Sequence, residues 1–283
     1  MLETRVRRRV NRRPTAGAAP LLQLVSDIGA ITAVITALLY YFGWVRTRFQ
    51  ARALGFDASV MQLGTTDYIL KSLNVLFTPL TVLIIAALAL NVVHARFVVP
   101  AIEVPTRRTA VLRMSTLLRR AWILLFPIAV ILLASPIRGY ALPAALTIAT
   151  LCALYSRALR RRVTGNDPWS TAMRAIVLVL LALGLFWATE RLARTMGEAF
   201  AADFASSPQQ LAAVTIYSTK DLEIDASGVD EEHIGTSESE YRYRYTGLYL
   251  LERSGDKYFL ITTGYGRVIA LRESDSLRME FGP

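Results

Sequence analysis

The chain has 283 residues, a formal net charge of +10 and a hydrophobic content of 53%. The charge is unevenly divided, because residues 1–194 carry 24 basic and 7 acidic side chains while residues 195–283 carry 8 and 15. The basic residues stand in short runs between long apolar stretches, which is typical of a membrane protein. Nucleic acid is therefore not an expected partner, despite the high pI. The single cysteine, Cys152, excludes an internal disulfide and a cysteine-based metal site.

Five apolar stretches are long enough, or nearly so, to cross a bilayer as helices. They cover residues 21–41, 68–93, 121–137, 140–155 and 172–193. The third and fourth are short and only Arg138 and Gly139 separate them, so they form either two spans or a re-entrant hairpin. The sequence thus predicts an α-helical membrane protein with about five transmembrane helices, followed by a small, mostly β C-terminal domain.

Arginine placement predicts the orientation of these spans. With five spans, 17 arginines fall on one side of the membrane, in the N-terminal tail and in the loops before the third span and after the fourth, and 4 fall in the opposite loops. Since cytoplasmic loops are enriched in arginine and lysine, we expect a cytoplasmic N-terminus and an extracytoplasmic C-terminal domain. The alanine-, leucine- and arginine-rich composition favours a bacterial plasma membrane. Residues 1–20 are predicted to be a disordered basic tail that lies against anionic headgroups.

Three polar residues fall within or beside the predicted spans. Asp27 lies in the first, and Lys71 and Asn74 lie near the outer end of the second. Polar groups at membrane depth often mark a transport path, so these three are candidates to line one. The alternative is that Asp27 pairs with the basic tail and that Lys71 extends to the headgroup region.

The predicted outer loop, residues 44–67, is basic for an extracytoplasmic segment, through Arg46, Arg48 and Arg52. The C-terminal domain on the same side is acidic. Complementary charge predicts that these arginines dock the loop onto that domain, and solvated charges on both surfaces are the alternative. Asp57 is predicted to cap a short helix within the loop.

Residues 40–77 carry the pattern FGWxRT, then GFD, then TxDYxLKS. This pattern resembles a group of actinobacterial multi-pass membrane proteins, mostly uncharacterised, with a C-terminal β domain. The segments YRYRYTG and GDKYF repeat the likeness in the C-terminal part. The resemblance implies the membrane class and the two-part architecture, and it supplies no substrate, cofactor or catalytic residue.

The last part of the chain changes to a β pattern. Residues 195–210 are predicted to extend the fifth helix and then form a linker, and residues 211–283 to form a barrel- or sandwich-like domain. Strands are expected at residues 212–217, 222–225, 241–252, 258–262, 267–271 and 277–281. Alternation places Tyr241, Tyr243 and Tyr245 on one face of a strand, which is either core or a partner surface.

The chain carries no recognisable catalytic motif. It lacks a Walker A loop, HExxH and GxSxG. The acidic run from Asp221 to Glu232, beside His233, offers oxygen ligands to a divalent cation, but its spacing matches no EF-hand and a solvated loop is the favoured interpretation. We therefore expect no enzymatic activity, no cofactor and no metal.

Two functions follow as expectations. In the first, the helices anchor the β domain, which binds an extracytoplasmic protein or envelope ligand in a regulatory or scaffolding role. In the second, the chain forms a homo-oligomeric channel or transport pore that the β domain caps. The lipid bilayer is a partner in both.

Overall fold

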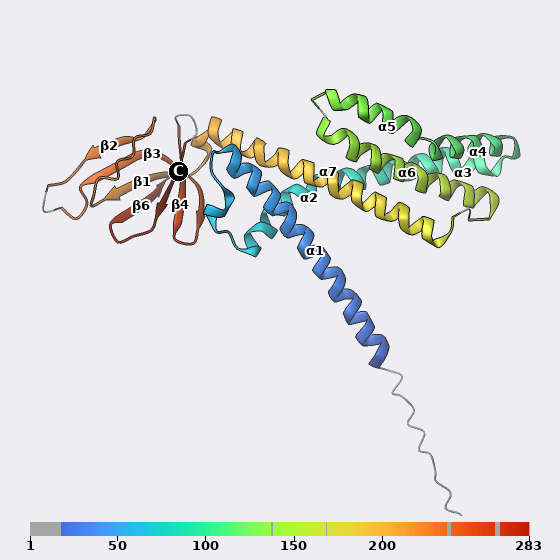
Figure 1. Ribbon diagram of the computed structural model, residues 1–283, viewed down its shortest axis with the longest axis horizontal. Helices are drawn as coiled ribbons and strands as arrows, with labels where there is room; N and C mark the ends of the chain where they lie inside the picture. The colour runs from blue at the N-terminus through green and yellow to red at the C-terminus, as the bar shows by residue number, and fades with distance from the viewer. Residues whose placement is uncertain (1–17, 137, 168, 237–238, 264–266, 283) are drawn as a thin grey trace, which may run out of the picture.

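The computed structural model describes residues 18–282 apart from 137, 168, 237–238 and 264–266, with side-chain surroundings from residue 28 onward. The predicted tail lies outside the described residues, except for residues 18–20. Helices occupy the first part of the chain and strands the last (Figure 1). The helices are α1 (Ala18–Ala53), η1 (Ala58–Met61), α2 (Thr65–Val93), η2 (His94–Val98), α3 (Val99–Glu103), α4 (Pro105–Arg119), α5 (Trp122–Ile131), η3 (Leu132–Ala134), α6 (Arg138–Thr164), α7 (Thr171–Ser206) and η4 (Pro208–Gln210).

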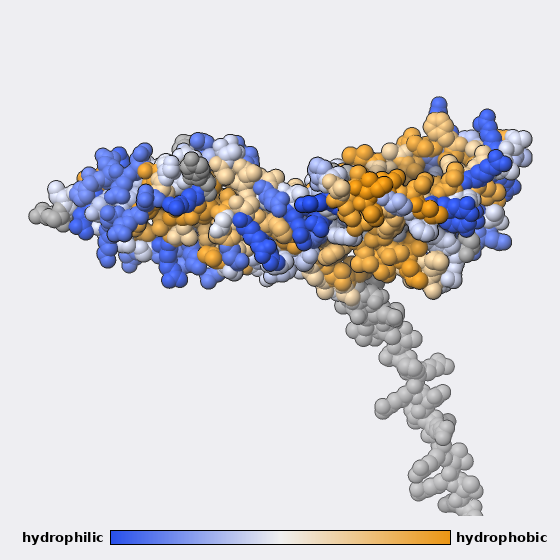
Figure 2. Space-filling view, turned by 45° about the horizontal axis from the view of Figure 1, so that its top comes forward, coloured by the Kyte–Doolittle hydropathy of each residue, from blue (hydrophilic) through white to orange (hydrophobic). Residues whose placement is uncertain are grey.

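Within the described residues, five helical segments are long and apolar enough to cross a membrane. They are Ile28–Ala53, Thr65–Glu103, Pro105–Ala134, Arg138–Thr164 and Thr171–Ser206. Their large apolar side chains are mostly exposed. Figure 2 shows hydrophobic residues over much of the helical part, whereas hydrophilic residues prevail on the β domain and at the opposite tip. Such an exposed apolar belt between two polar ends has the form of a membrane-facing surface.

The first half of α1 stands apart from the other helices (Figure 1). Its residues 28–38 are exposed on every side, and burial begins at Phe42. From there α1 packs against α2 and α7 around a cluster of Phe42, Val45, Val75 and Ala193. The three helices therefore meet at the end nearest the sheet.

The arginine-rich segment before the third span, predicted as a loop, is helical. It contains the π-helical turn η2 and then α3 and α4. Leucine, methionine, alanine and arginine are all good helix formers. One apolar face of this segment, with Val98 and Val111, packs on Leu159 and Val163 of α6. Tertiary packing thus turns a polar connection into an extension of the helical bundle at its basic end.

The strands form one antiparallel sheet in the order β5-β4-β3-β1-β6, with β2 also paired to β3. The sheet is strongly curled, because the Tyr258 ring of β4 lies 6.1 Å from the Phe281 ring of β6, although β3 and β1 lie between these two strands in the sheet. It therefore resembles an open barrel rather than a two-sheet sandwich. The strands are β1 (Ala213–Ser218), β2 (Asp230–His233), β3 (Tyr243–Ser254), β4 (Lys257–Thr262), β5 (Val268–Arg272) and β6 (Leu277–Gly282).

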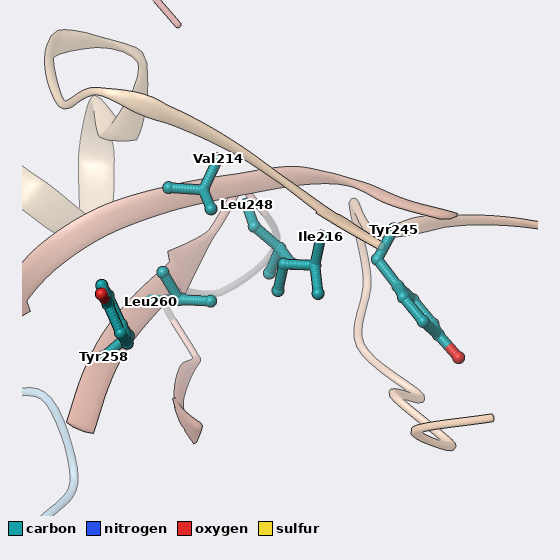
Figure 3. Packing of buried hydrophobic residues seen from close by; sticks show 6 residues of the cluster. All are labelled: Val214, Ile216, Tyr245, Leu248, Tyr258 and Leu260. Atoms are coloured by element: carbon teal, nitrogen blue, oxygen red, sulfur yellow. The ribbon is translucent and has the colours of Figure 1, made fainter. Parts of the chain in front are cut away.

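The concave face of the sheet holds the core of the β domain. Figure 3 shows its buried centre, made by Val214, Ile216, Tyr245, Leu248, Tyr258 and Leu260. Leu222 and Ile224, predicted to lie in a strand, instead belong to a non-strand segment that packs against this core. The prediction was wrong because the segment turns at Glu223, whose φ is 49°, a value incompatible with a strand.

Candidate partner-binding domain and its junction with the helices

The β domain is attached to the helices by a short connection. Helix α7 continues to Ser206, the single turn η4 follows, and β1 begins at Ala213. The backbone N–H of Leu250 donates to the Ala212 carbonyl at 2.9 Å, so the sheet already holds the chain at the end of this connection. A link this short leaves the sheet little freedom to move away from α7.

An ion pair joins α2 to the sheet. The Nζ of Lys71 lies 2.6 Å from Oε2 of Glu252, on β3. Both side chains are largely buried, with exposed fractions of 19% and 18%. A pair in this environment is less screened by water and salt than a surface pair. The residue predicted to line a transport path is therefore engaged in domain docking.

An aromatic contact lies beside this ion pair. Phe56, which follows α1, stacks on Phe259 of β4 with ring centroids 5.7 Å apart. Lys257, at the start of β4, donates to the Val60 carbonyl of η1 at 3.3 Å. Residues 258–262 of β4 are all buried, which means that both faces of this strand are covered. One face packs in the sheet core and the other, through Phe259, on the helical part.

The three arginines predicted to dock the loop belong to α1, because that helix runs to Ala53. Arg46 donates to the Lys71 carbonyl at 3.0 Å and lies over the Phe200 ring of α7. Arg48 lies over Trp44 and Arg52 over Phe49. Among the described ion pairs, Lys71 and not an arginine makes the link to the acidic domain, while Arg46 braces the backbone that carries Lys71.

Close backbone contact fixes the helices that carry the sheet. A Cβ on Gly43 of α1 would lie 1.8 Å from the Tyr68 carbonyl oxygen of α2. A Cβ on Gly197 of α7 would lie 2.3 Å from the Arg46 carbonyl oxygen. Only glycine permits these approaches. Helices α1, α2 and α7 thus form a tightly packed platform under the β domain.

Tyr245 does not lie on a partner surface, because its exposed fraction is 0%. Its hydroxyl donates to Oδ1 of Asp221 at 2.9 Å and accepts from the Leu222 N–H at 2.8 Å. Burial raises the pKa of its phenol to about 12. Tyr243 is half-buried against the core and against His233, and Tyr241 packs on Tyr217. Tyr243 and Tyr245 therefore belong to the core, whereas Tyr241 lies outside the core cluster.

Strand β2 lies at the end of the β domain away from the helices (Figure 1) and has an open edge, as do the terminal strands β5 and β6 of the sheet. Strand β2, part of the acidic run, pairs only with β3 among the described strands, and all four of its residues are exposed. Glu232 on β2 pairs with Arg244. Within the described residues, no three histidine, cysteine or acidic side chains come together as a metal site would require.

The other two predicted path residues do not join Lys71. Asn74 is exposed on the surface of α2. Asp27 lies in α1, but its side-chain surroundings are outside the described part of the molecule. Nothing in the described residues brings the three together.

Sequence reasoning missed Phe56, Glu252 and Phe259 at the junction. A signal was present for Phe259 alone: YFLI in β4 is an unbroken apolar run, which in a strand indicates burial on both faces. Comparison with family models, with curated proteins and with solved structures finds no match to this chain, so the likeness to the actinobacterial group stays a prediction.

Proposed function

We propose that this chain is a multi-pass protein of a bacterial plasma membrane that holds an extracytoplasmic β domain on a rigid helical platform, where the domain binds a protein or envelope ligand. The bilayer covers the apolar belt. Arg138 and Arg157, at either end of the apolar part of α6, lie about 28 Å apart along the helix axis. This distance matches the hydrocarbon thickness of about 30 Å.

This placement puts the arginine-rich ends of α4 and α6 in the cytoplasm and the sheet outside. From Arg191 to Ser206, α7 then projects about 22 Å beyond the bilayer at 1.5 Å per residue. The ends of α1 and α2 accompany it. Spans three and four both cross in this arrangement, since Pro105–Ala134 and Arg138–Thr164 are each long enough.

The observation that carries the binding proposal is the contrast between the two ends of the sheet. One end is fixed to the helices by Lys71, Phe56 and a short link, and the other presents the open β2 edge. Exposed edge strands bind extended segments by adding a strand. The acidic side chains of β2, Asp230 to Glu232, favour a partner segment with positive charge.

Crosslinking in living cells tests this proposal. A photo-crosslinking amino acid at Glu231, on β2, should give a discrete adduct. The same group at Glu273, exposed near the helices, is the matched control and should give none. A Glu231 site without adducts, or an identical pattern at both positions, would contradict binding at this edge.

Orientation needs its own test. In a Cys152→Ser background, Glu231→Cys should react with an impermeant maleimide added to intact cells, and Arg161→Cys should react only after the cells are opened. The reverse pattern would overturn the proposed topology without bearing on which edge binds.

In the alternative, a homo-oligomeric pore, Lys71 is not available to line the pore because it is paired with Glu252. This alternative keeps one supporting observation, the unpartnered first half of α1. The native mass of the protein in detergent, corrected for bound detergent, separates the two proposals. A closed ring of four or more copies favours the pore, and a monomer or dimer favours the binding role.

A further inference from the structure

A cleft of about 460 Å³, with both polar and apolar side chains in its lining, lies where the α5–α6 turn meets α7. Three arginines face it, together with the first turn of α6 and two hydroxyl groups. The residues that carry the argument are Arg138, Gly139, Tyr140, Arg191, Arg194 and Thr195. We refer to this set as the arginine cleft.

The arginine cleft has more positive charge than its carboxylates neutralise. Arg194 pairs with Glu190 one turn before it. Arg138 and Arg191 have no carboxylate partner among the described residues, and the Nε of Arg191 is buried without a hydrogen-bond acceptor there. Glu198 is the one carboxylate in the lining, and it is exposed. A buried guanidinium N–H without an acceptor is unfavourable unless something fills the site.

The packing of α6 on α7 brings the positive charge of Arg191 to the start of α6. The Arg191 side chain crosses the start of α6, since a Cβ on Gly139 would lie 3.6 Å from its Cδ and 3.8 Å from its Nε. The Tyr140 hydroxyl donates to the Arg191 carbonyl at 3.3 Å and so ties α6 to α7. The positive end of the α6 dipole adds to the guanidinium groups, as at other anion sites on helix N-termini.

We propose that the arginine cleft binds the phosphate group of an anionic ligand, either a phospholipid headgroup or a soluble phosphate ester. Guanidinium groups bind phosphate oxygens through two parallel hydrogen bonds, and Arg191 has the unpaired N–H groups to do so. Arg138 supplies a second charge. The site is one hydrocarbon thickness along α6 from Arg157, at the depth where lipid phosphates lie. Arginine at this level is otherwise disfavoured on the outer side of a bacterial membrane.

The test uses the full chain, purified in a maltoside detergent without phosphate. Native mass spectrometry counts bound phosphatidylglycerol, with diacylglycerol as the phosphate-free lipid. Equilibrium dialysis measures binding of glycerol 3-phosphate. The variants are Arg191→Gln and Arg138→Gln, and the matched control is Arg52→Gln, an exposed arginine near the same end of the helices that makes no ion pair.

We expect phosphatidylglycerol to bind wild type and diacylglycerol not to bind. Arg191→Gln should weaken binding about tenfold or more, since a charged hydrogen-bonding partner is lost. Arg138→Gln, at an exposed position that cannot threaten folding, should weaken it by a smaller factor, and Arg52→Gln should leave it unchanged. Binding of glycerol 3-phosphate with the same dependence on Arg191, without lipid binding, would assign the soluble source and support the site. No phosphate binding to wild type, or an equal loss in Arg52→Gln, would overturn it.

Discussion

The ion pair between Lys71 and Glu252 should control how firmly the β domain docks on the helices. The 2.6 Å pair is four-fifths buried. Its energy should therefore lie between that of an exposed pair, about 0–1 kcal/mol, and the 3–5 kcal/mol lost when a buried pair is broken. We take the contribution of this pair to docking as about 1–2 kcal/mol. Removal of either side chain should then raise the undocked population about 5–30-fold.

Distances between spin labels measure this population. In a Cys152→Ser background, labels at Ala53→Cys of α1 and Asp275→Cys of the β domain, both exposed, should give one narrow distance distribution. Lys71→Ala and Glu252→Ala should each add a broad component at longer distance.

A double-mutant cycle tests the cause. The double variant Lys71→Ala/Glu252→Ala should lose little more than either single variant, because both remove the same interaction. Exchanging the two charges should restore part of the narrow distribution. Glu273→Ala removes an exposed pair with Arg253 and should change nothing. Additive losses in the double variant, or a broadened distribution in Glu273→Ala, would refute the reasoning.

Other variants probe packing and charge, and thermal unfolding measures each. Gly43→Ala should destabilise the protein by about 1–3 kcal/mol, since its Cβ would collide with the Tyr68 carbonyl. Tyr245→Phe should cost about 1–3 kcal/mol, because the Leu222 N–H loses its acceptor, whereas Asp221 still accepts from the Glu223 N–H. Because the Tyr245 pKa is raised from 10.0 to about 12, folding favours the neutral phenol; wild-type stability should fall as pH rises through this window, and the variant should lack that fall. Two arginines lower the pKa of Asp167, so Asp167→Asn should destabilise at neutral pH and match wild type as pH falls well below 4.

The helical part was largely predictable, because the length of an apolar run is itself the signal for a span. What the runs did not reveal is where each helix ends. Helix α1 continues through Arg46, Arg48 and Arg52 to Ala53 since the same residues that make it polar also form helices well. Hydropathy marks where a helix enters water, and helix propensity then decides how far it continues.

The strands show the converse limit. Alternating or continuous apolar patterns between turn residues placed five of the six strands within about two residues. Strand β2, Asp230–His233, carries no such pattern, because all four residues are exposed and acidic residues are poor strand formers. Strand β2 forms through its pairing with β3, and this pairing cannot be read from the local sequence.

The junction was the least predictable feature, because its partners are remote in the sequence. Lys71 and Glu252 are separated by 181 positions, and no local pattern relates them. Within a span, an isolated lysine has the same appearance whether it lines a path, extends to the interface or meets a carboxylate from another domain. Its role follows only from the contact.

That contact also bears on how the β domain could act. Movement of the sheet away from α2 would expose Phe56 and Phe259 to water and leave Lys71 and Glu252 unpaired, so docking is favoured by both apolar and electrostatic terms. A partner bound at the open β2 edge would therefore contact a sheet whose other end is fixed to the helices. A shift of the sheet would first change its contacts with α2, just above the bilayer in the proposed placement. A purely tethering role would need only the link after α7; the additional contacts with α1 and α2 are what favour a domain whose position, and not only its presence, matters.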